Sequence, residues 1–220
     1  MNFKEVKKFI LNKLRKELSK NLTYHSANHI KDVYKAAKML ARLEGVSGDD
    51  LTLLLTAALF HDSGCLWQQY EHERVSCEIA REHLPTYNYT HDQIERICGM
   101  IMATKVPQQP QNKLEEILCD ADLDYLGRDD FNKIGNGLYE ELCMYGLIDN
   151  EHDWNRLQLR FMEKHRFFTE SAKKLRKATK EAHISKIKEM LKSQHGEIPD
   201  GSAHLLSIPP DRVKIDRENT

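Results

Sequence analysis

The sequence predicts an all-α protein, and three observations lead to this prediction. Apolar residues recur three and four positions apart along most of the chain, with charged residues between them, which is the pattern of helices that bury one face. No run shows the strict alternation of apolar and polar residues that a half-buried strand requires. Capping residues, glycines and prolines divide the chain into segments of helical length.

The first three predicted helices lead to an unusual polar pair. Residues 3–18 form an amphipathic helix, and Ser26 caps a second helix that Gly45 ends. Residues 51–60 are apolar nearly all round the helix axis, which predicts a central buried helix. This helix delivers His61-Asp62 to its C-terminal end.

Two further helices and a loop follow the central helix. A helix through residues 75–84 ends at Pro85, because proline cannot continue it. Residues 90–93 have the spacing of a capping box, which predicts a helix that continues to about Thr104. Residues 106–112 contain two prolines and three glutamines and therefore form a loop.

The second half of the chain continues the helical pattern. The predicted helices lie at residues 113–126, closed by Gly127, from 131 to Gly146, at 153–165 and at 169–193. Residues 196–220 contain three prolines and few packing residues, which predicts a poorly structured C-terminal tail. We therefore expect a single helical domain over residues 1–195 and a tail over residues 196–220.

The composition narrows the classes of partner and compartment. The 33 basic and 34 acidic residues nearly cancel, so no overall field favours nucleic acid or an anionic membrane. The five cysteines are odd in number and form no CxxC pair, which fits reduced thiols in a cytoplasm. No segment approaches the roughly 18 apolar residues of a membrane span. We expect a cytoplasmic protein that binds neither membrane nor nucleic acid, with the lysine-rich run at 173–177 forming a solvated outer helix face.

His61-Asp62 is the candidate for chemistry because it ends the most apolar run in the chain. Burying these groups is costly unless they are paired, hydrogen-bonded or bound to a cation. The earlier His29 and the later Asp122 can complete a nitrogen and oxygen ligand set for a divalent ion. The alternative for any single histidine is an ordinary core or surface side chain.

These residues carry a family resemblance. His29 at a helix start, His61-Asp62 after the sequence Ala-Ala-Leu-Phe, and Asp122 within residues 119–127 resemble the H…HD…D signature of the HD-domain metal-dependent phosphohydrolases. The resemblance covers about residues 24–127 directly. Residues 154–191 also look like the C-terminal helices of small, single-domain bacterial HD proteins.

The resemblance implies a multi-helix HD-domain bundle with a divalent metal site in its core. The implied ligands are His29, His61, Asp62 and Asp122. The alternatives to Asp122 are Asp120 and Asp124, which point about 200° around the helix axis from it. The ion can be Mn, Mg, Co, Fe, Zn or Ni.

One ion is favoured over two. Family members with a second ion use further histidines between HD and the last aspartate, and here this interval holds three separate histidines and no adjacent His-His pair. These histidines are His72, His83 and His91. A second ion stays open. The Gly-Tyr-Pro motif of the cyclic-dinucleotide branch is absent from the sequence, which argues against that branch.

Three residues are the candidates for catalysis. Asp62 can orient a water, and Glu73 resembles the acidic position that follows HD in nucleotidase-like members. Lys105 lies at a helix end before a loop and can hold phosphate. The alternative for Glu73 and Lys105 is that each stabilises a helix terminus through the helix dipole. His25 can polarise a leaving group or support His29.

The implied function is hydrolysis of a phosphate ester of a nucleotide or a related small phosphorylated metabolite by a metal-dependent enzyme. The alternative from another class is a non-catalytic sensor or regulatory module that binds such a ligand in the same fold. A third is a helical bundle with incidental histidines. The expected partner is a small, nucleotide-like phosphorylated substrate, and a homodimer stays open. Residues 67–70 and 106–112 are expected to shape the substrate pocket.

Overall fold

A computed structural model describes residues 1–68 and 70–194, and within them the chain is helical without strands. The predicted tail, residues 196–220, lies outside the described residues, and the domain boundary at 195 stays a prediction. The described helices are, in chain order, α1 (Phe3–Glu17), α2 (Ala27–Leu43), α3 (Gly48–Phe60), α4 (His72–His83), α5 (His91–Ala103), α6 (Lys113–Asp122), α7 (Phe131–Met144), α8 (Glu151–Lys164) and α9 (Glu170–Gln194). Short 3₁₀ helices follow α3, α4 and α6, namely η1 (Ser63–Leu66), η2 (Leu84–Tyr87) and η3 (Asp124–Gly127).

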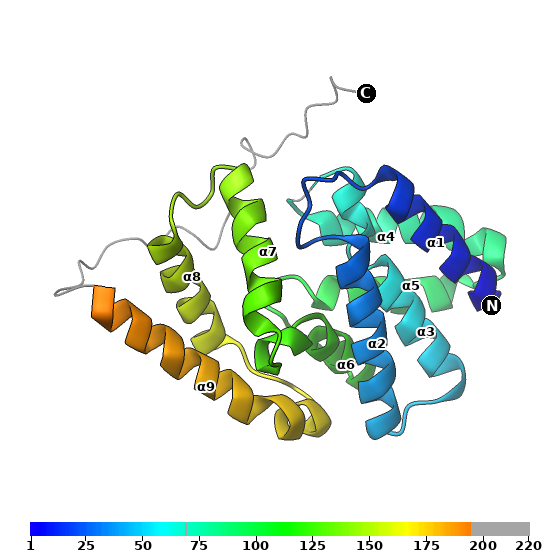
Figure 1. The fold of residues 1–220 in the computed structure, drawn as a ribbon. Coiled ribbons are helices and arrows are strands. Elements are labelled where there is room, and N and C mark those ends of the chain that lie inside the picture. The colour runs from blue at the N-terminus through cyan, green and yellow to red at the C-terminus, as the bar shows by residue number, and fades with distance from the viewer. Residues whose placement is uncertain (69, 195–220) are drawn as a thin grey trace.

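The helices fall into two groups in space. Figure 1 shows α1 to α6 together on one side, and α7, α8 and α9 on the other. Within the first group, α3 packs against α1, α2, α5 and α6, and residues 53–60 are all buried. The prediction of a central buried helix is therefore confirmed.

Start and stop signals set several helix ends as expected. The Ser26 side chain accepts a hydrogen bond from the His29 backbone N–H at the start of α2, and Thr90 and Gln93 form a reciprocal capping box at the start of α5. The expected helix over residues 113–126 is wrong at its C-terminal end, because α6 ends at Asp122 and η3 follows. Leu123 leaves the helical conformation, with φ −105° and ψ 17°. The break turns Asp124 toward Arg176, which donates to it at 2.7 Å.

Two acids, the buried Asp120 and the partly buried Glu44, attach the start of α9 to the first group. Asp120 accepts hydrogen bonds from the backbone N–H groups of Phe168 and Thr169, both at 2.8 Å. Glu44, after the end of α2, accepts one from the Ser171 N–H at 2.9 Å and pairs with Lys113. These contacts hold α9 against α2 and α6.

Replacing Glu44 with glutamine is expected to destabilise the protein in a pH-dependent way. Lys113 and the hydrogen bonds from Ser171 outweigh burial and lower the pKa of Glu44 from 4.5 to about 2. Because the pKa of Glu44 is lowered in the folded state, its carboxylate contributes fully to the free energy of unfolding above about pH 4.5. This contribution is lost as the pH falls toward 2. Urea unfolding of Glu44→Gln and of the native protein between pH 7 and 3 measures the difference, which should shrink with acid.

The matched control is Glu78→Gln, because Glu78 lies in an exposed pair with Arg74 and exposed pairs contribute little. Its free energy of unfolding should stay close to that of the native protein. A Glu44→Gln difference that is constant over this pH range would contradict the role of the Glu44 carboxylate.

Candidate metal centre

The end of α3 places His61 and Asp62 inside the protein. His61 is fully buried and Asp62 is 3% exposed. His61 Nδ1 lies 2.9 Å from the Ala58 carbonyl, and because a carbonyl only accepts, Nδ1 carries the proton and donates. The other ring nitrogen, Nε2, therefore presents a lone pair when the ring is neutral.

Two other helix ends supply the remaining members of the predicted set. His29 lies in the first turn of α2, where the Tyr24 ring packs against it at 4.7 Å between centroids. Asp122 is the last residue of α6. The break after α6 leaves Asp122 at the helix end facing α2 and α3, whose side chains it contacts.

Four atoms from these residues converge. His29 Nε2 lies 3.3 Å from Asp62 Oδ2, 3.1 Å from Asp122 Oδ1 and 3.4 Å from His61 Nε2. His61 Nε2 lies 3.2 Å from Asp62 Oδ2 and 3.5 Å from Asp122 Oδ1. We call His29, His61, Asp62 and Asp122 the four-residue centre.

The four-residue centre fits a divalent ion. Ligand atoms that share an ion at about 2.0–2.2 Å lie roughly 2.8–3.6 Å from one another, and the observed separations fall in this range. Asp62 Oδ2 is buried and has no hydrogen-bond partner, although a buried carboxylate oxygen ordinarily has one. Its neighbours are ring nitrogens, and a cation between them would satisfy it. His29, His61 and Asp122 also satisfy the spacing of a metal-binding group.

The charges of the centre suit a cation. Burial alone would raise the pKa of Asp122, but His29 and His61 lower it to about 2, and the histidines similarly lower the pKa of Asp62 well below its usual range. Burial would lower the pKa of His61, but Asp62 and Asp122 raise it well above the usual range. Both carboxylates are therefore ionised at neutral pH, and an incoming ion displaces a proton held between the histidines and the acids.

Glu141 orients His25 and was not predicted from the sequence. This acid of α7 is 2% exposed and accepts from the backbone N–H of Tyr24 at 2.9 Å and from that of His25 at 3.1 Å. Its other oxygen lies 2.5 Å from His25 Nδ1. Burial opposes protonation of His25, but Glu141 raises the His25 pKa above 6.5. The available signal was an acid three residues after Leu138 on the inward face of the helix.

His72 is the histidine of the intervening segment that reaches the centre. Its Nε2 lies 3.3 Å from Asp62 Oδ1 and 3.6 Å from Glu73 Oε1. His83 instead packs on Phe9 at 4.8 Å between centroids, and the His91 side chain is 86% exposed. Of the three histidines considered for a second ion, His72 therefore lies at the centre, and His83 and His91 do not. The choice between one ion and two stays a prediction.

The candidate catalytic residues lie around one cavity. A cavity of about 470 Å³ is lined by Asp62, Glu73 and Lys105, together with His25 and His72. Glu73 is buried, and Lys105 Nζ donates to Glu71 Oε1 at 3.4 Å. Their catalytic roles stay predictions, while the structure places all three at the same cavity.

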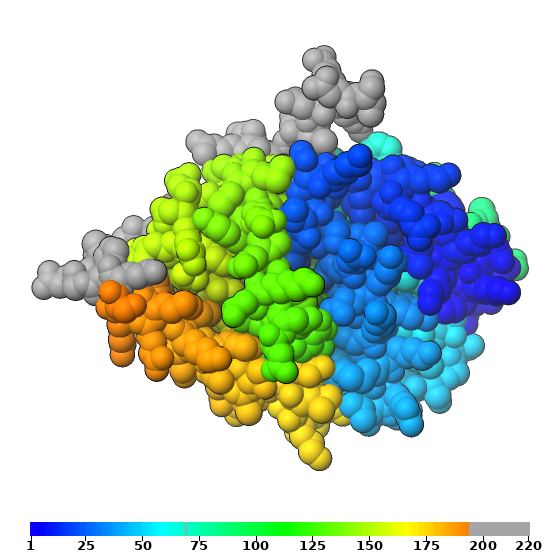
Figure 2. Space-filling model, viewed as in Figure 1, coloured from blue at the N-terminus to red at the C-terminus, as the bar shows by residue number. Residues whose placement is uncertain are grey.

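The walls of this cavity correct the expected substrate pocket in part. Tyr70 and Val106 come from the two loops expected to shape it, but a large apolar wall comes from α7 and α8. The residues of this wall are Leu138, Leu142, Trp154, Leu157 and Phe161. Figure 2 shows the surfaces of α7 and α2 adjoining in this view. Just before α2, Thr23 Oγ1 donates a hydrogen bond to the Gly137 carbonyl of α7 at 2.6 Å.

The two alternatives to Asp122 have other partners. Asp120 binds the start of α9, as described above. Asp124 is 2% exposed, and it accepts hydrogen bonds from Arg176 and Arg128. Of the three aspartates, only Asp122 lies in the four-residue centre.

The basic residues of α9 do not all lie on a solvated face. Arg176 faces inward to Asp124, and Lys180 is buried against the Met162 carbonyl, so part of the basic run serves packing. The absence of nucleic-acid binding stays a prediction. Among the helices of residues 1–68 and 70–194, none is long and apolar enough to span a membrane.

The chain is similar to one protein family and to two solved structures. The family model of the HD domain matches residues 26–124. Among solved structures, a predicted HD superfamily hydrolase from an uncultured Thermotogales bacterium is 20% identical, with a TM-score of 0.56 over 86% of this chain and 92% of that one. A protein from Lactobacillus plantarum is 18% identical, with a TM-score of 0.58 over 87% of this chain and 97% of that one.

The family match and the structural matches support different statements. At this level of identity the two solved structures show a shared fold. A search among curated proteins finds no match for the chain. The matched segment contains all of the four-residue centre, in the order that the sequence pattern predicts. Over residues 26–124 the chain therefore matches the HD domain family.

Proposed function

We propose that the protein is a metal-dependent phosphohydrolase that cleaves a phosphate ester of a nucleotide or a related small phosphorylated metabolite. The observation that carries this proposal is the four-residue centre, which opens into a cavity of about 470 Å³ that is also lined by a lysine and three further acids. The five cysteines are free and four are buried, which supports the cytoplasmic location that we propose with this function.

The four-residue centre would hold the ion through two imidazoles and two carboxylates. When bound, a divalent ion lowers the pKa of a coordinated water and neutralises charge on phosphoryl oxygens. Asp62 contributes Oδ2 to the centre, and its Oδ1 faces His72 at 3.3 Å. Asp62 can therefore orient a water between the centre and His72.

Three groups around the cavity would handle the phosphate and the protons. Lys105 exchanges its contact with Glu71 for a phosphoryl oxygen, because a doubly charged phosphate is the stronger partner. Glu73 positions the attacking water or accepts its proton. Glu141 holds the His25 ring in one orientation and stabilises its protonated form, so that His25 polarises the oxygen of the leaving group.

The experiment is a phosphate-release screen on the full chain. The substrates are nucleoside 5′-monophosphates, sugar phosphates and an aryl phosphate, each with Mn²⁺, Co²⁺ or Mg²⁺ and each again with a chelator. We expect release with an ion and none with the chelator. If an ion binds and no ester is cleaved, hydrolysis is contradicted and the same cavity serves a non-catalytic sensor.

Replacing Lys105 with methionine is expected to raise KM about ten-fold and to leave kcat within a few-fold of the native value. The reason is that a phosphate contact equally strong in the bound substrate and in the transition state affects binding and not the chemical step. Steady-state kinetics on the best substrate measure both constants. The control is Lys38→Met, which removes an exposed lysine of α2 outside the cavity. An unchanged KM for Lys105→Met would contradict the phosphate contact.

A further inference from the structure

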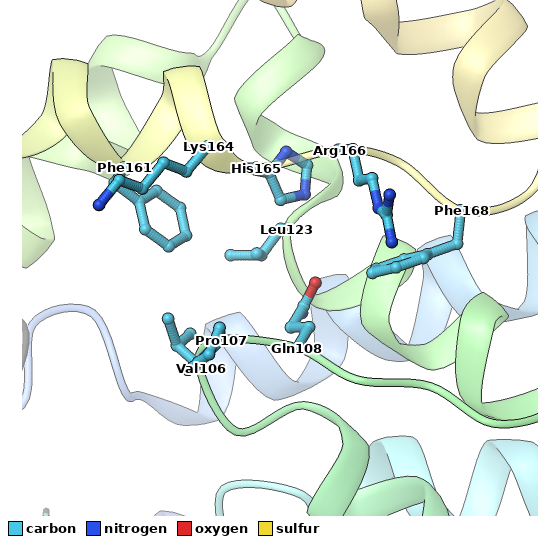
Figure 3. Close-up of a pocket in the computed structure, with 9 residues that line it drawn as sticks. All are labelled: Val106, Pro107, Gln108, Leu123, Phe161, Lys164, His165, Arg166 and Phe168. Atoms are coloured by element: carbon cyan, nitrogen blue, oxygen red, sulfur yellow. The ribbon is translucent and has the colours of Figure 1, made fainter.

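A second cavity of about 290 Å³ lies beside the cavity of the four-residue centre. Figure 3 shows its walls, which come from residues 106–108 after α5, from residues 161–168 around the end of α8, and from Leu123. Val106, Leu123 and Phe161 line both cavities. Because Leu123 directly follows Asp122 and lines both cavities, the second cavity lies next to the four-residue centre.

Gln108 presents a buried oxygen at this cavity. Its amide nitrogen Nε2 donates to the Cys119 carbonyl at 3.1 Å. Since a carbonyl only accepts, this bond fixes which end of the amide is nitrogen. The amide oxygen Oε1 is buried and has no hydrogen-bond partner, so Gln108 offers an unused acceptor.

His165 presents a buried donor at the same cavity. Lys180 Nζ donates to the Met162 carbonyl at 3.1 Å and lies 3.3 Å from His165 Nδ1. An ammonium group only donates, so Nδ1 accepts and the proton of the neutral ring is on Nε2. Burial and the charge of Lys180 lower the pKa of His165 to about 3, which keeps the ring neutral. Nε2 is buried and has no hydrogen-bond partner.

These two atoms stand out in the molecule. Among the described residues, the buried side-chain nitrogen and oxygen atoms without a partner are Asp62 Oδ2, Gln108 Oε1 and His165 Nε2. The first belongs to the four-residue centre, and both of the others belong to residues that line the second cavity. Native proteins rarely leave such groups unpaired. One water takes about 30 Å³, so the cavity has room for a larger ligand.

We propose that the second cavity binds the planar heterocycle of the substrate, a nucleobase, with Gln108 Oε1 accepting from a ring or exocyclic N–H and His165 Nε2 donating to the neighbouring acceptor. This inference rests on the proposed function, since it places the phosphate of the same molecule at the four-residue centre. Figure 3 shows a nitrogen of His165 and the oxygen of Gln108 directed toward the same space. Nucleobases carry a donor beside an acceptor on one edge, which matches this pair.

The other walls suit the faces and the charge of such a ligand. Pro107, Leu123, Phe161 and Phe168 supply apolar surface, and aromatic rings favour stacking with bases. The Arg166 guanidinium lies over the Phe168 ring, 5.7 Å from its centroid. Lys164 and Arg166 are exposed and line the cavity, so its rim is positive and attracts an anionic nucleotide.

The test separates heterocycle binding from hydrolysis. Calorimetry measures binding of adenosine, guanosine, cytidine and uridine, which lack phosphate, to the full chain. The variants are Gln108→Met and the matched pair His165→Asn and His165→Gln, because glutamine can place an N–H near Nε2 and asparagine cannot. We expect at least one nucleoside to bind, Gln108→Met and His165→Asn to weaken it about ten-fold, and His165→Gln to retain it within about three-fold.

Kinetics provide the second readout. For the monophosphate of the best nucleoside, Gln108→Met and His165→Asn should raise KM about ten-fold with kcat little changed, while turnover of ribose 5-phosphate, which lacks the base, should not change. Thermal unfolding checks that each variant is folded. The proposal is overturned if no nucleoside binds, if ordered water alone fills the cavity in a crystal soaked with nucleoside, or if all variants bind equally. Nucleoside binding without any phosphate release would instead overturn the proposed hydrolysis and leave the heterocycle site standing.

Discussion

Replacing Asp62 with asparagine is expected to lower the affinity for a divalent ion by at least about 100-fold and kcat/KM by more than about 1,000-fold. Asp62 Oδ2 lies 3.2 Å and 3.3 Å from the Nε2 atoms of His61 and His29 and has no other partner. Asparagine keeps the shape and removes the negative charge. The fall in ion affinity and in kcat/KM therefore measures the effect of the ligand's negative charge and not of packing.

The measurements are ion titration and phosphate release on the same samples. Asp92→Asn is the control, because the Asp92 side chain is fully exposed beside His91. It should match the native protein in both assays. Full ion affinity in Asp62→Asn would contradict the placement of Asp62 in the centre.

Replacing Gly64 with alanine is expected to destabilise the protein by about 3 kcal/mol or more, since overpacking that needs a backbone shift lies at the upper end of such effects. A Cβ on Gly64 would lie only 1.9 Å from the backbone oxygen of His72. The Gly64 N–H also donates to Ser76 Oγ at 2.8 Å, and Ser76 Oγ donates to the His61 carbonyl at 2.6 Å. The start of α4 must therefore move away from the centre.

Thermal unfolding should show a Tm that falls by roughly 6–12 °C, and ion affinity should fall with it because His61 and His72 shift. Gly99→Ala is the matched control within α5. Its Cβ would meet only the Glu115 carboxylate, at 3.3 Å, and alanine favours the helix, so stability should change by less than about 1 kcal/mol. Equal stability of Gly64→Ala and the native protein would contradict the close approach of the two segments.

Much of the fold follows from local pattern, and its exceptions come from distant contacts. The apolar run of α3 predicts burial because no polar face exists to turn outward, and the caps at Ser26 and Thr90 act within one helical turn. The end of α6 was missed, because apolar spacing continues past Leu123. The pairing of Asp124 with Arg176, 52 residues away in the sequence, accompanies the break, and no local rule contains it.

The residues of the site also differ in how far the sequence predicts them. His29, His61, Asp62 and Asp122 were predicted from their order and the family resemblance, and the structure brings them together. Glu141 was missed because its partners, Tyr24 and His25, are 117 and 116 residues away. The second cavity forms where the connection between α8 and α9 meets the loop between α5 and α6. His165 and Gln108, one from each segment, are about 57 residues apart in the chain. A single sequence does not reveal that these segments meet.

The metal site is tested most directly by measuring ion content and ion affinity in the native protein, His61→Ala and His91→Ala. Both variants lose one imidazole, but His61 is fully buried in the centre while His91 is exposed. The native protein and His91→Ala should bind a divalent ion with equal affinity, and His61→Ala should bind it at least about 100-fold more weakly. Equal affinity in His61→Ala, or no ion binding by the native protein at all, would contradict the metal centre.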